Sequence, residues 1–114
     1  MPSDAHPHAY AYAVLARGTD PAQRDRYLAW LIDGGHVRAV VQAGAQSGEV
    51  TVLDEPASGE PVWAIETRYC FVSKAAFEAY VRDHAPALRA EGIKLFPPDS
   101  GIRLERRAGV VYRP

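Results

Sequence analysis

Side chains alternate strictly along residues 62–72, and this pattern constrains the fold more than any other feature of the chain. One set of alternating positions holds Trp63, Ile65, Tyr69 and Phe71, whereas the other set mixes small, apolar and charged residues. A period of two predicts a β-strand, because successive side chains of a strand point to opposite faces. A strand with so large a face needs a sheet and a covering layer to bury it.

Three other stretches have strand character. They are residues 8–16, 45–54 and 102–112. The first alternates tyrosine and alanine, and Gly109 in the last indicates a β-bulge. Residues 55–61, EPASGEP, have the composition of a turn, which predicts an antiparallel hairpin between the two strands that they join.

A first helix is expected after Asp20. Asp20 suits the N-cap position, and Gln23 can complete a capping box. The Gly34-Gly35 pair should end or kink this helix, since each glycine costs about 1 kcal/mol relative to alanine in a helix interior. A second, short helical piece is predicted over residues 36–42.

A further helix is expected after Ser73, which is also a suitable N-cap. Pro86 should interrupt this helix and restart it, Gly92 should end it, and residues 94–101 should form a loop. His84 falls on the apolar stripe of the helix, so we interpret it as a half-buried histidine with its hydrogen bonds satisfied.

The predicted order of elements is β-α-β-β-α-β, the ferredoxin-like split βαβ arrangement. We therefore expect an α+β fold with a four-stranded antiparallel sheet and two helices on one face. Residues 8–114 form a single domain in this interpretation, and residues 1–7 form a flexible tail.

Helices on one face leave the other face of the sheet open. The sequence does not assign which alternating set faces the helices. If Tyr10, Tyr12, Trp63 and Tyr69 lay on the open face, they would expose a patch larger than soluble monomers usually leave bare. The simplest way to bury this patch is to pack it against a second copy of the chain in a closed twofold dimer. The alternative is a monomer with a few surface aromatics.

Composition excludes several classes of protein. The chain has 114 residues, of which 47% are apolar and 24% are charged, and its formal net charge is -1. This balance argues against nucleic-acid and membrane-surface partners, and the single cysteine, Cys70, excludes an intrachain disulfide. No apolar run approaches the ~20 residues of a membrane span, and no signal segment is visible, so we expect a cytoplasmic protein. RNA-recognition modules share the βαββαβ order, but the glycine pattern of their third strand is missing here.

Two segments carry a pattern beyond periodicity, WLIDGGHVRAVVQAGA and FEAYVRDHAPALRAEGIKLF. With the strands around them they resemble an uncharacterised bacterial family of the dimeric α+β barrel superfamily, over about residues 9–112. The matching positions are Trp30, His36, Gly44, Ala85, Pro86, Leu88, Arg89, Gly92 and Phe96. The resemblance implies a ferredoxin-like fold and a homodimer of two sheets, with no established reaction.

Better-known members of that superfamily include cofactor-independent monooxygenases of the antibiotic-biosynthesis type, haem-degrading enzymes and isomerase-like barrels. The resemblance implies that their shared site, a pocket between helices and sheet, exists here too. The haem-degrading members need an asparagine in that site, and this chain contains none. The chain therefore fits the haem-degrading members poorly. We expect no cofactor.

His36 is the candidate catalytic base, since it follows a helix break and an unperturbed imidazole titrates near pH ~6.5. Trp30, Tyr10, Tyr12 and Tyr69 join it as candidate ligand-binding residues, because phenol groups can orient a polar ligand. The simpler interpretations stay open: His36 caps the kink, and the strand aromatics pack in a core or an interface. No set of residues has the spacing of a metal site or a nucleophile elbow.

Two functions follow from these residues. One is a homodimer whose pocket binds a small apolar or aromatic molecule, alone or with cofactor-free proton transfer by His36, as in a monooxygenase or isomerase. The other is a purely structural or interaction module without a substrate.

Overall fold

The structure is a computed structural model, which describes residues 8–54 and 62–114. The strands are β1 (Tyr10–Gly18), β2 (Ser47–Leu53), β3 (Trp63–Phe71) and β4 (Arg103–Val110). The helices are α1 (Pro21–Ile32), α2 (His36–Gln42), α3 (Lys74–Asp83) and α4 (Ala85–Leu95), followed by the short 3-10 helix η2 (Pro98–Ser100). The expected tail at residues 1–7 and the expected turn at residues 55–61 lie outside the described residues.

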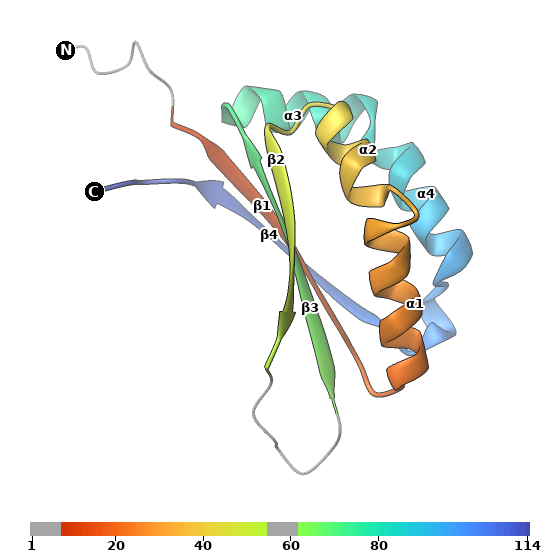
Figure 1. Ribbon diagram of the computed structural model, residues 1–114. Helices are drawn as coiled ribbons and strands as arrows, with labels where there is room; N and C mark the ends of the chain where they lie inside the picture. The colour runs from red at the N-terminus through yellow and green to blue at the C-terminus, as the bar shows by residue number, and fades with distance from the viewer. Residues whose placement is uncertain (1–7, 55–61) are drawn as a thin grey trace, which may run out of the picture.

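The strands form one antiparallel sheet in the order β2-β3-β1-β4, and all four α-helices lie on the same face of it (Figure 1). This is the predicted ferredoxin-like fold, with each of its two helical segments divided into two helices. In the described part of the chain no helix has the length and apolar character needed to cross a bilayer.

Strand register decides which side chains face the helices. Tyr12 of β1 lies opposite Tyr69 of β3 and opposite Ala108 of β4, so these residues share a face. The aromatic set lies on that face and is covered by the helices, with exposed fractions of 5% for Tyr12, 7% for Trp63 and 2% for Tyr69. Of the two alternatives that the sequence left open, the structure therefore excludes the one in which these aromatics lie on the open face.

The opposite, open face carries the small residues of the two central strands. Ala11, Ala13 and Leu15 of β1 lie opposite Cys70, Arg68 and Glu66 of β3. Helix packing explains the choice of face, because bulky side chains fill the space between a sheet and helices, where aromatic residues bury about 150–250 Å² each. The RNA-recognition alternative loses its aromatic platform, since Tyr69 and Phe71 point under the helices.

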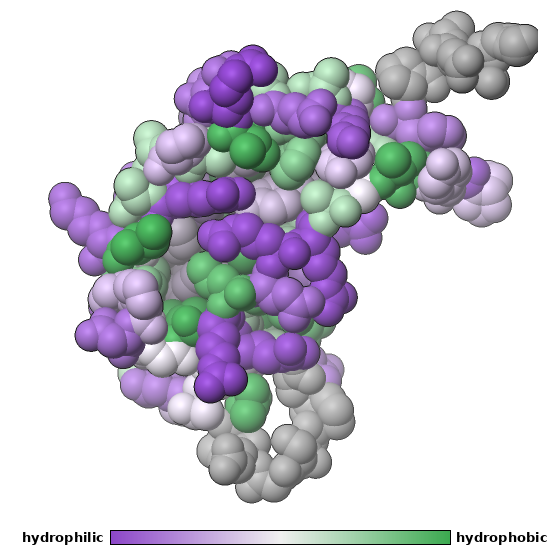
Figure 2. All heavy atoms as spheres, turned by 180° about the vertical axis from the view of Figure 1, so that it is seen from behind, coloured by the Kyte–Doolittle hydropathy of each residue, from purple (hydrophilic) through white to green (hydrophobic). Residues whose placement is uncertain are grey.

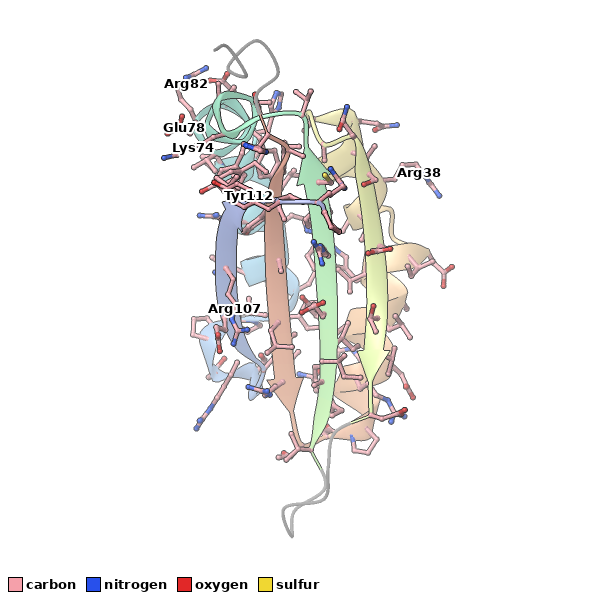
Figure 3. All side chains as sticks on the ribbon, turned by 90° about the vertical axis from the view of Figure 1, so that its left-hand side faces the viewer. Arg38, Lys74, Glu78, Arg82, Arg107 and Tyr112 are labelled. Carbon is pink, nitrogen blue, oxygen red and sulfur yellow. The ribbon has the colours of Figure 1, made fainter. Side chains whose placement is uncertain are left out.

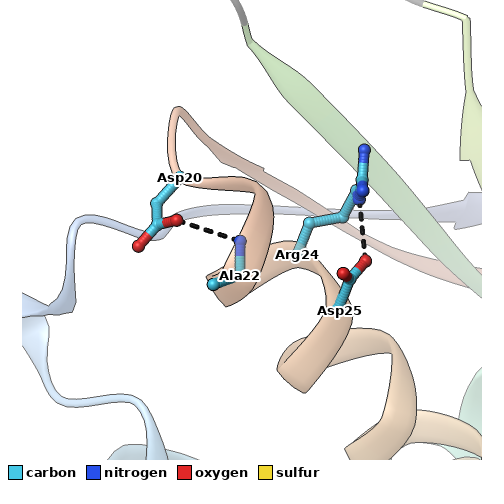
Figure 4. Close-up of polar contacts among 4 residues, drawn as sticks. All are labelled: Asp20, Ala22, Arg24 and Asp25. Atoms are coloured by element: carbon cyan, nitrogen blue, oxygen red, sulfur yellow. Dashed lines mark hydrogen bonds and ion pairs between the residues drawn. The ribbon is translucent and has the colours of Figure 1, made fainter.

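Two predicted N-caps are confirmed. Asp20 Oδ1 accepts a hydrogen bond from the Ala22 backbone N–H at 2.9 Å (Figure 4), and Ser73 Oγ accepts one from the Ala76 N–H at 3.1 Å. The expected capping box is wrong, because Gln23 donates through Nε2 to the Ser100 carbonyl at 3.2 Å instead. Gln23 thereby ties the start of α1 to η2.

The two helix breaks occur where glycine and proline predict them. Gly35 has φ +78°, a left-handed conformation that favours glycine, and a Cβ on Gly34 would lie 2.7 Å from the Trp30 carbonyl oxygen. At the second break His84 ends α3, and it is exposed rather than half-buried as we expected. Pro86 lies in the first turn of α4, where its missing N–H costs no helical hydrogen bond.

Two glycine predictions are wrong. Helix α4 continues past Gly92 to Leu95. Glycine at this position makes room for the Trp30 ring, since a Cβ would lie 3.1 Å from Trp30 Cη2. Gly109 makes no bulge, since the pairing of β4 with β1 runs without interruption and sets Gly109 opposite Ala11.

Candidate functional site

A pocket lies between the helices and the sheet, where two hydrophobic clusters meet. One cluster, under α2 and α3, contains Tyr12 and Tyr80, and the other, under α1, contains Tyr27 and Leu31; all four residues line the pocket. The volume open to the centre of a water-sized sphere is about 80 Å³. A single water molecule needs about 10–15 Å³ by the same measure. The pocket is therefore large enough for a ligand fragment rather than a single solvent molecule.

The pocket opens between α4 and β4. Ile93 of α4 and Leu104 of β4 line it and are nevertheless 58% and 46% exposed. Figure 2 views the molecule from behind, and hydrophobic residues gather there in a hollow between bands of hydrophilic ones. A ligand can therefore enter from solvent without unfolding the core.

Trp30 and His36 form one wall of this pocket. The break at Gly34-Gly35 turns α2 back against α1, so that the two rings stack with centroids 4.0 Å apart and an interplanar angle of 22°. Trp30 Nε1 also donates a hydrogen bond to Glu91 Oε1 on α4 at 3.4 Å. Burial lowers the pKa of His36, although Glu91 raises it in part, so the imidazole is neutral at pH 7.

Two arginines meet at the Tyr12 hydroxyl group. Arg106 of β4 donates through Nε to the Tyr12 oxygen at 3.2 Å, and Arg89 of α4 donates through a terminal nitrogen to the same oxygen at 3.5 Å. Both arginines line the pocket. Paired strands and a covering helix thus bring three residues that are distant in sequence to one point.

Three polar atoms in the lining residues are buried without a hydrogen-bond partner. They are Thr67 Oγ1, His36 Nδ1 and Arg89 Nε. Thr67 is 1% exposed and lies on the inner face of β3, opposite Val14. Buried polar groups are normally paired, because each unpaired one costs about 1–3 kcal/mol. A ligand or ordered water would remove that cost.

Three of the phenol groups that line the pocket are neutral at physiological pH. Burial raises the pKa of Tyr27 and of Tyr80 to about 12, although Arg106 lowers both in part. Burial also raises the pKa of Tyr69. These hydroxyl groups can donate or accept hydrogen bonds, but they do not supply negative charge to a ligand.

The structure brings four of the five sequence-predicted site residues together. Trp30, His36, Tyr12 and Tyr69 all line the pocket. Tyr10 does not; its ring packs 5.1 Å from Phe77 in the cluster under α3, so it is a core residue. No group of residues suited to holding a metal ion occurs within residues 8–54 and 62–114.

Sequence reasoning missed the two arginines and Thr67. Arg106 had a usable signal, since it continues the apolar alternation of Ile102 and Leu104 into the inner face of β4. An arginine on such an edge strand can reach over the pocket while part of its side chain stays in solvent, as the exposed Arg106 does. Arg89 shares one face of α4 with Gly92 and Phe96, at helical spacing, and all three line the pocket.

No family model matches the chain, and no curated protein matches its sequence. Many solved structures share its fold. A dimeric ferredoxin-like protein from an uncultured marine organism matches with a TM-score of 0.67 and 10% identity, over 94% of this chain and 98% of that one. A dimeric ferredoxin-like protein of unknown function from Thermobifida fusca matches with a TM-score of 0.58 and 15% identity, over 92% of both chains.

An enzyme is also among these structural neighbours. A monooxygenase from the gene ActVA-Orf6 of Streptomyces coelicolor, in complex with the ligand nanaomycin D, matches with a TM-score of 0.60 and 17% identity, over 94% of this chain and 90% of that one. At these identities the likeness establishes a shared fold, and it leaves the activity of this chain to be argued from its own residues.

Proposed function

We propose that the protein binds a small, largely aromatic molecule in the pocket between its helices and sheet. One observation carries the proposal: an aromatic-walled cavity contains unpartnered polar atoms at Thr67, His36 and Arg89. Apolar walls with a few converging polar groups are typical of small-molecule sites. A structural neighbour in complex with nanaomycin D adds support, since its fold is the same.

The proposal can be tested by titrating a panel of aromatic and quinone-like compounds into the wild-type protein, His36→Ala and Leu88→Trp. The large side chain at Leu88, which also lines the pocket, should block binding by filling it. His36→Ala should weaken binding, because it removes half of the Trp30 stack. Binding that is absent from the wild type would favour the structural-module interpretation, and equal binding to all three proteins would place the ligand elsewhere.

A second candidate function adds proton transfer to binding. His36 supports it, because the imidazole lies beside the pocket with an unpartnered Nδ1 and a lowered pKa, and is therefore a free base at neutral pH. A monooxygenase among the structural neighbours points the same way. With 1,4-dihydroxynaphthalene as probe, oxygen uptake should fall about 10²-fold or more in His36→Gln if His36 is the base. An unchanged rate would exclude it from catalysis.

We also propose that two copies pack through their open sheet faces. The small side chains of Ala11 and Ala13 allow close approach, Leu15 adds apolar surface beside them, and sheets that pack face to face lie about 10 Å apart. Figure 3 shows this face toward the viewer, with Arg107 and Tyr112 on it and the helices behind. Structural neighbours described as dimeric support the proposal.

Charges on the open face suit a twofold interface. Glu66 and Arg68 alternate along β3, and Arg107 lies on the same face of β4. In a twofold interface, residue i of one copy contacts residue j of the other copy, and j contacts i in the same way. A face that carries both acidic and basic groups can therefore pair with a second copy of itself. Light scattering should give the dimer mass for the wild type and the monomer mass for Ala13→Arg. The control Ala90→Arg, which changes an exposed residue of α4, should keep the dimer mass. A wild-type monomer would refute the dimer.

The cytoplasm is the compartment we propose. In the described structure Cys70 is a free thiol on the open face of the sheet. A reducing compartment would preserve it in that form.

A further inference from the structure

We infer that the pocket selects ligands whose aromatic body carries a carboxylate group. The inference rests on the proposed function and narrows it to one class of ligand. It follows from the charges and the unfilled hydrogen bonds of the residues that line the cavity.

The lining is positively charged. The described lining residues include two arginines, Arg89 and Arg106, and no aspartate, glutamate or lysine. Within the described chain neither guanidinium group forms an ion pair, whereas three exposed arginines do. The pKa shifts of Tyr27, Tyr69, Tyr80 and His36 keep these four lining side chains neutral at pH 7. Arg89 is half-buried and Arg106 is exposed. Water therefore screens Arg106 in part, whereas the charge of Arg89 lies beside apolar walls and attracts an anion more strongly.

The hydrogen-bonding capacity of the groups around Tyr12 is only partly used. The Tyr12 oxygen accepts from both Arg89 and Arg106, and no described residue accepts a hydrogen bond from its own O–H. Arg89 Nε–H is buried and unpartnered as well. The Thr67 hydroxyl group, 1% exposed and also unpartnered, lies two residue pairs farther along the sheet from Tyr12, on the same face.

A carboxylate can accept hydrogen bonds from these donors and also balance the charge of the arginines, which a neutral ligand cannot do. Its two oxygens accept about four hydrogen bonds and match the fork of a guanidinium group. The Tyr12 O–H and an arginine N–H can share its oxygens, while the attached ring lies against Trp30 and Phe96, whose centroids are 5.6 Å apart. A carboxylate on an aromatic ring therefore suits both halves of the pocket.

The test compares matched probes that differ in charge. 2-Naphthoate, its amide 2-naphthamide and 2-naphthol are titrated by calorimetry into the wild type, Arg89→Met, Arg106→Met and Tyr12→Phe. Arg82→Met is the control, because the exposed Arg82 pairs with Asp83 and does not line the pocket; Figure 3 labels it on α3. Far-ultraviolet circular dichroism of each variant confirms that it is folded.

The wild type and the control should prefer naphthoate over naphthamide by about tenfold to hundredfold, which is the usual value of hydrogen bonds to charged groups. Each arginine variant should lose most of that preference while binding the amide within about twofold of wild type. A rising salt concentration should weaken the binding of naphthoate and leave the binding of the two neutral probes unchanged. Naphthamide or naphthol binding as tightly as naphthoate to the wild type would overturn the inference and leave the proposed function intact. No binding by any probe would overturn both.

Discussion

The imidazole of His36 stacks on the indole of Trp30, with ring centroids 4.0 Å apart and planes inclined by 22°. The two residues belong to different helices, α2 and α1, which the Gly34-Gly35 break folds against each other. Trp30 also donates a hydrogen bond to Glu91 on α4. One aromatic pair therefore joins three helices at the wall of the pocket, and changes at His36 should affect both stability and binding.

Acidification should weaken the fold through His36. Burial lowers the pKa of His36 below its ordinary value of 6.5, although Glu91 raises it in part. The unfolded chain therefore binds this proton more readily than the folded chain. The contribution of His36 to the free energy of unfolding is complete above about pH 6.5 and is lost as the pH falls from there through the lowered pKa. Urea unfolding at several values between about pH 8 and pH 5 measures this loss.

Two variants identify the group that titrates. His36→Phe keeps an aromatic ring beside Trp30 and should flatten the pH dependence of stability between about pH 7 and pH 5. His84→Gln changes an exposed histidine and should leave that dependence as it is in wild type. A His36→Phe profile that still matches wild type would show that another group controls acid sensitivity.

Gly92→Ala should displace the Trp30 ring. A Cβ at Gly92 would lie 3.1 Å from Trp30 Cη2, closer than ordinary packing allows. Overpacking costs about 1–3 kcal/mol, and replacing a helical glycine by alanine returns about 1 kcal/mol, so the net loss of stability should be about 0–2 kcal/mol. Ligand affinity and Trp fluorescence should both change. Ala90→Ser, exposed on the same helix, is the control, and an unaltered emission spectrum in Gly92→Ala would contradict the prediction.

Thr67→Val should separate stability from binding. The Thr67 Oγ1 is buried without a partner, and valine has nearly the same shape without the hydroxyl group. The free energy of unfolding should rise by about 1 kcal/mol, because an unpaired buried polar group is removed. Affinity for a polar aromatic ligand should fall. Thr51→Val, exposed on β2, should shift stability by less than about 0.5 kcal/mol. A less stable Thr67→Val would mean that the hydroxyl group has a bound partner in solution.

Asp20→Ala should destabilise the start of α1. The Asp20 carboxylate accepts the Ala22 N–H at 2.9 Å, and loss of such a cap costs about 0.5–2 kcal/mol. Asp20→Asn should retain most of that stability. Asp25→Ala should cost less than Asp20→Ala, because its ion pair with Arg24 is exposed and such pairs contribute about 0–1 kcal/mol. Equal losses in Asp20→Asn and Asp20→Ala would argue that the cap is not the cause.

Local signals in the sequence were enough to predict the elements and their order. Period-two alternation located β3, and the residues Asp20, Ser73 and Gly34-Gly35 marked helix ends and a break that the structure contains. Each of these signals acts through atoms that lie within a few residues of one another. The fold class followed because βαββαβ order leaves few arrangements of a sheet.

Contacts between distant residues were harder to predict. Both faces of β1 are apolar or small, so alternation alone does not say that Tyr12 points inward; the packed helices decide it. Arg89 and Arg106 meet at Tyr12 only because β4 pairs with β1 and α4 crosses above them. The roles of His36, Trp30, Tyr12 and Tyr69 in binding stay predictions, although all four line one cavity.

The central position of β1 has a consequence for how the chain reaches its native state. Tyr10 pairs with Phe71 on one side and with Val110 on the other, so β1 precedes both of its partners by a long stretch of chain. The β2–β3 pair joins neighbouring segments and can form early, whereas β1 and β4 must close long loops. High contact order slows folding. On the ribosome the edge of β1 that pairs with β4 would stay open until synthesis is nearly complete, and an open strand edge can pair with other chains.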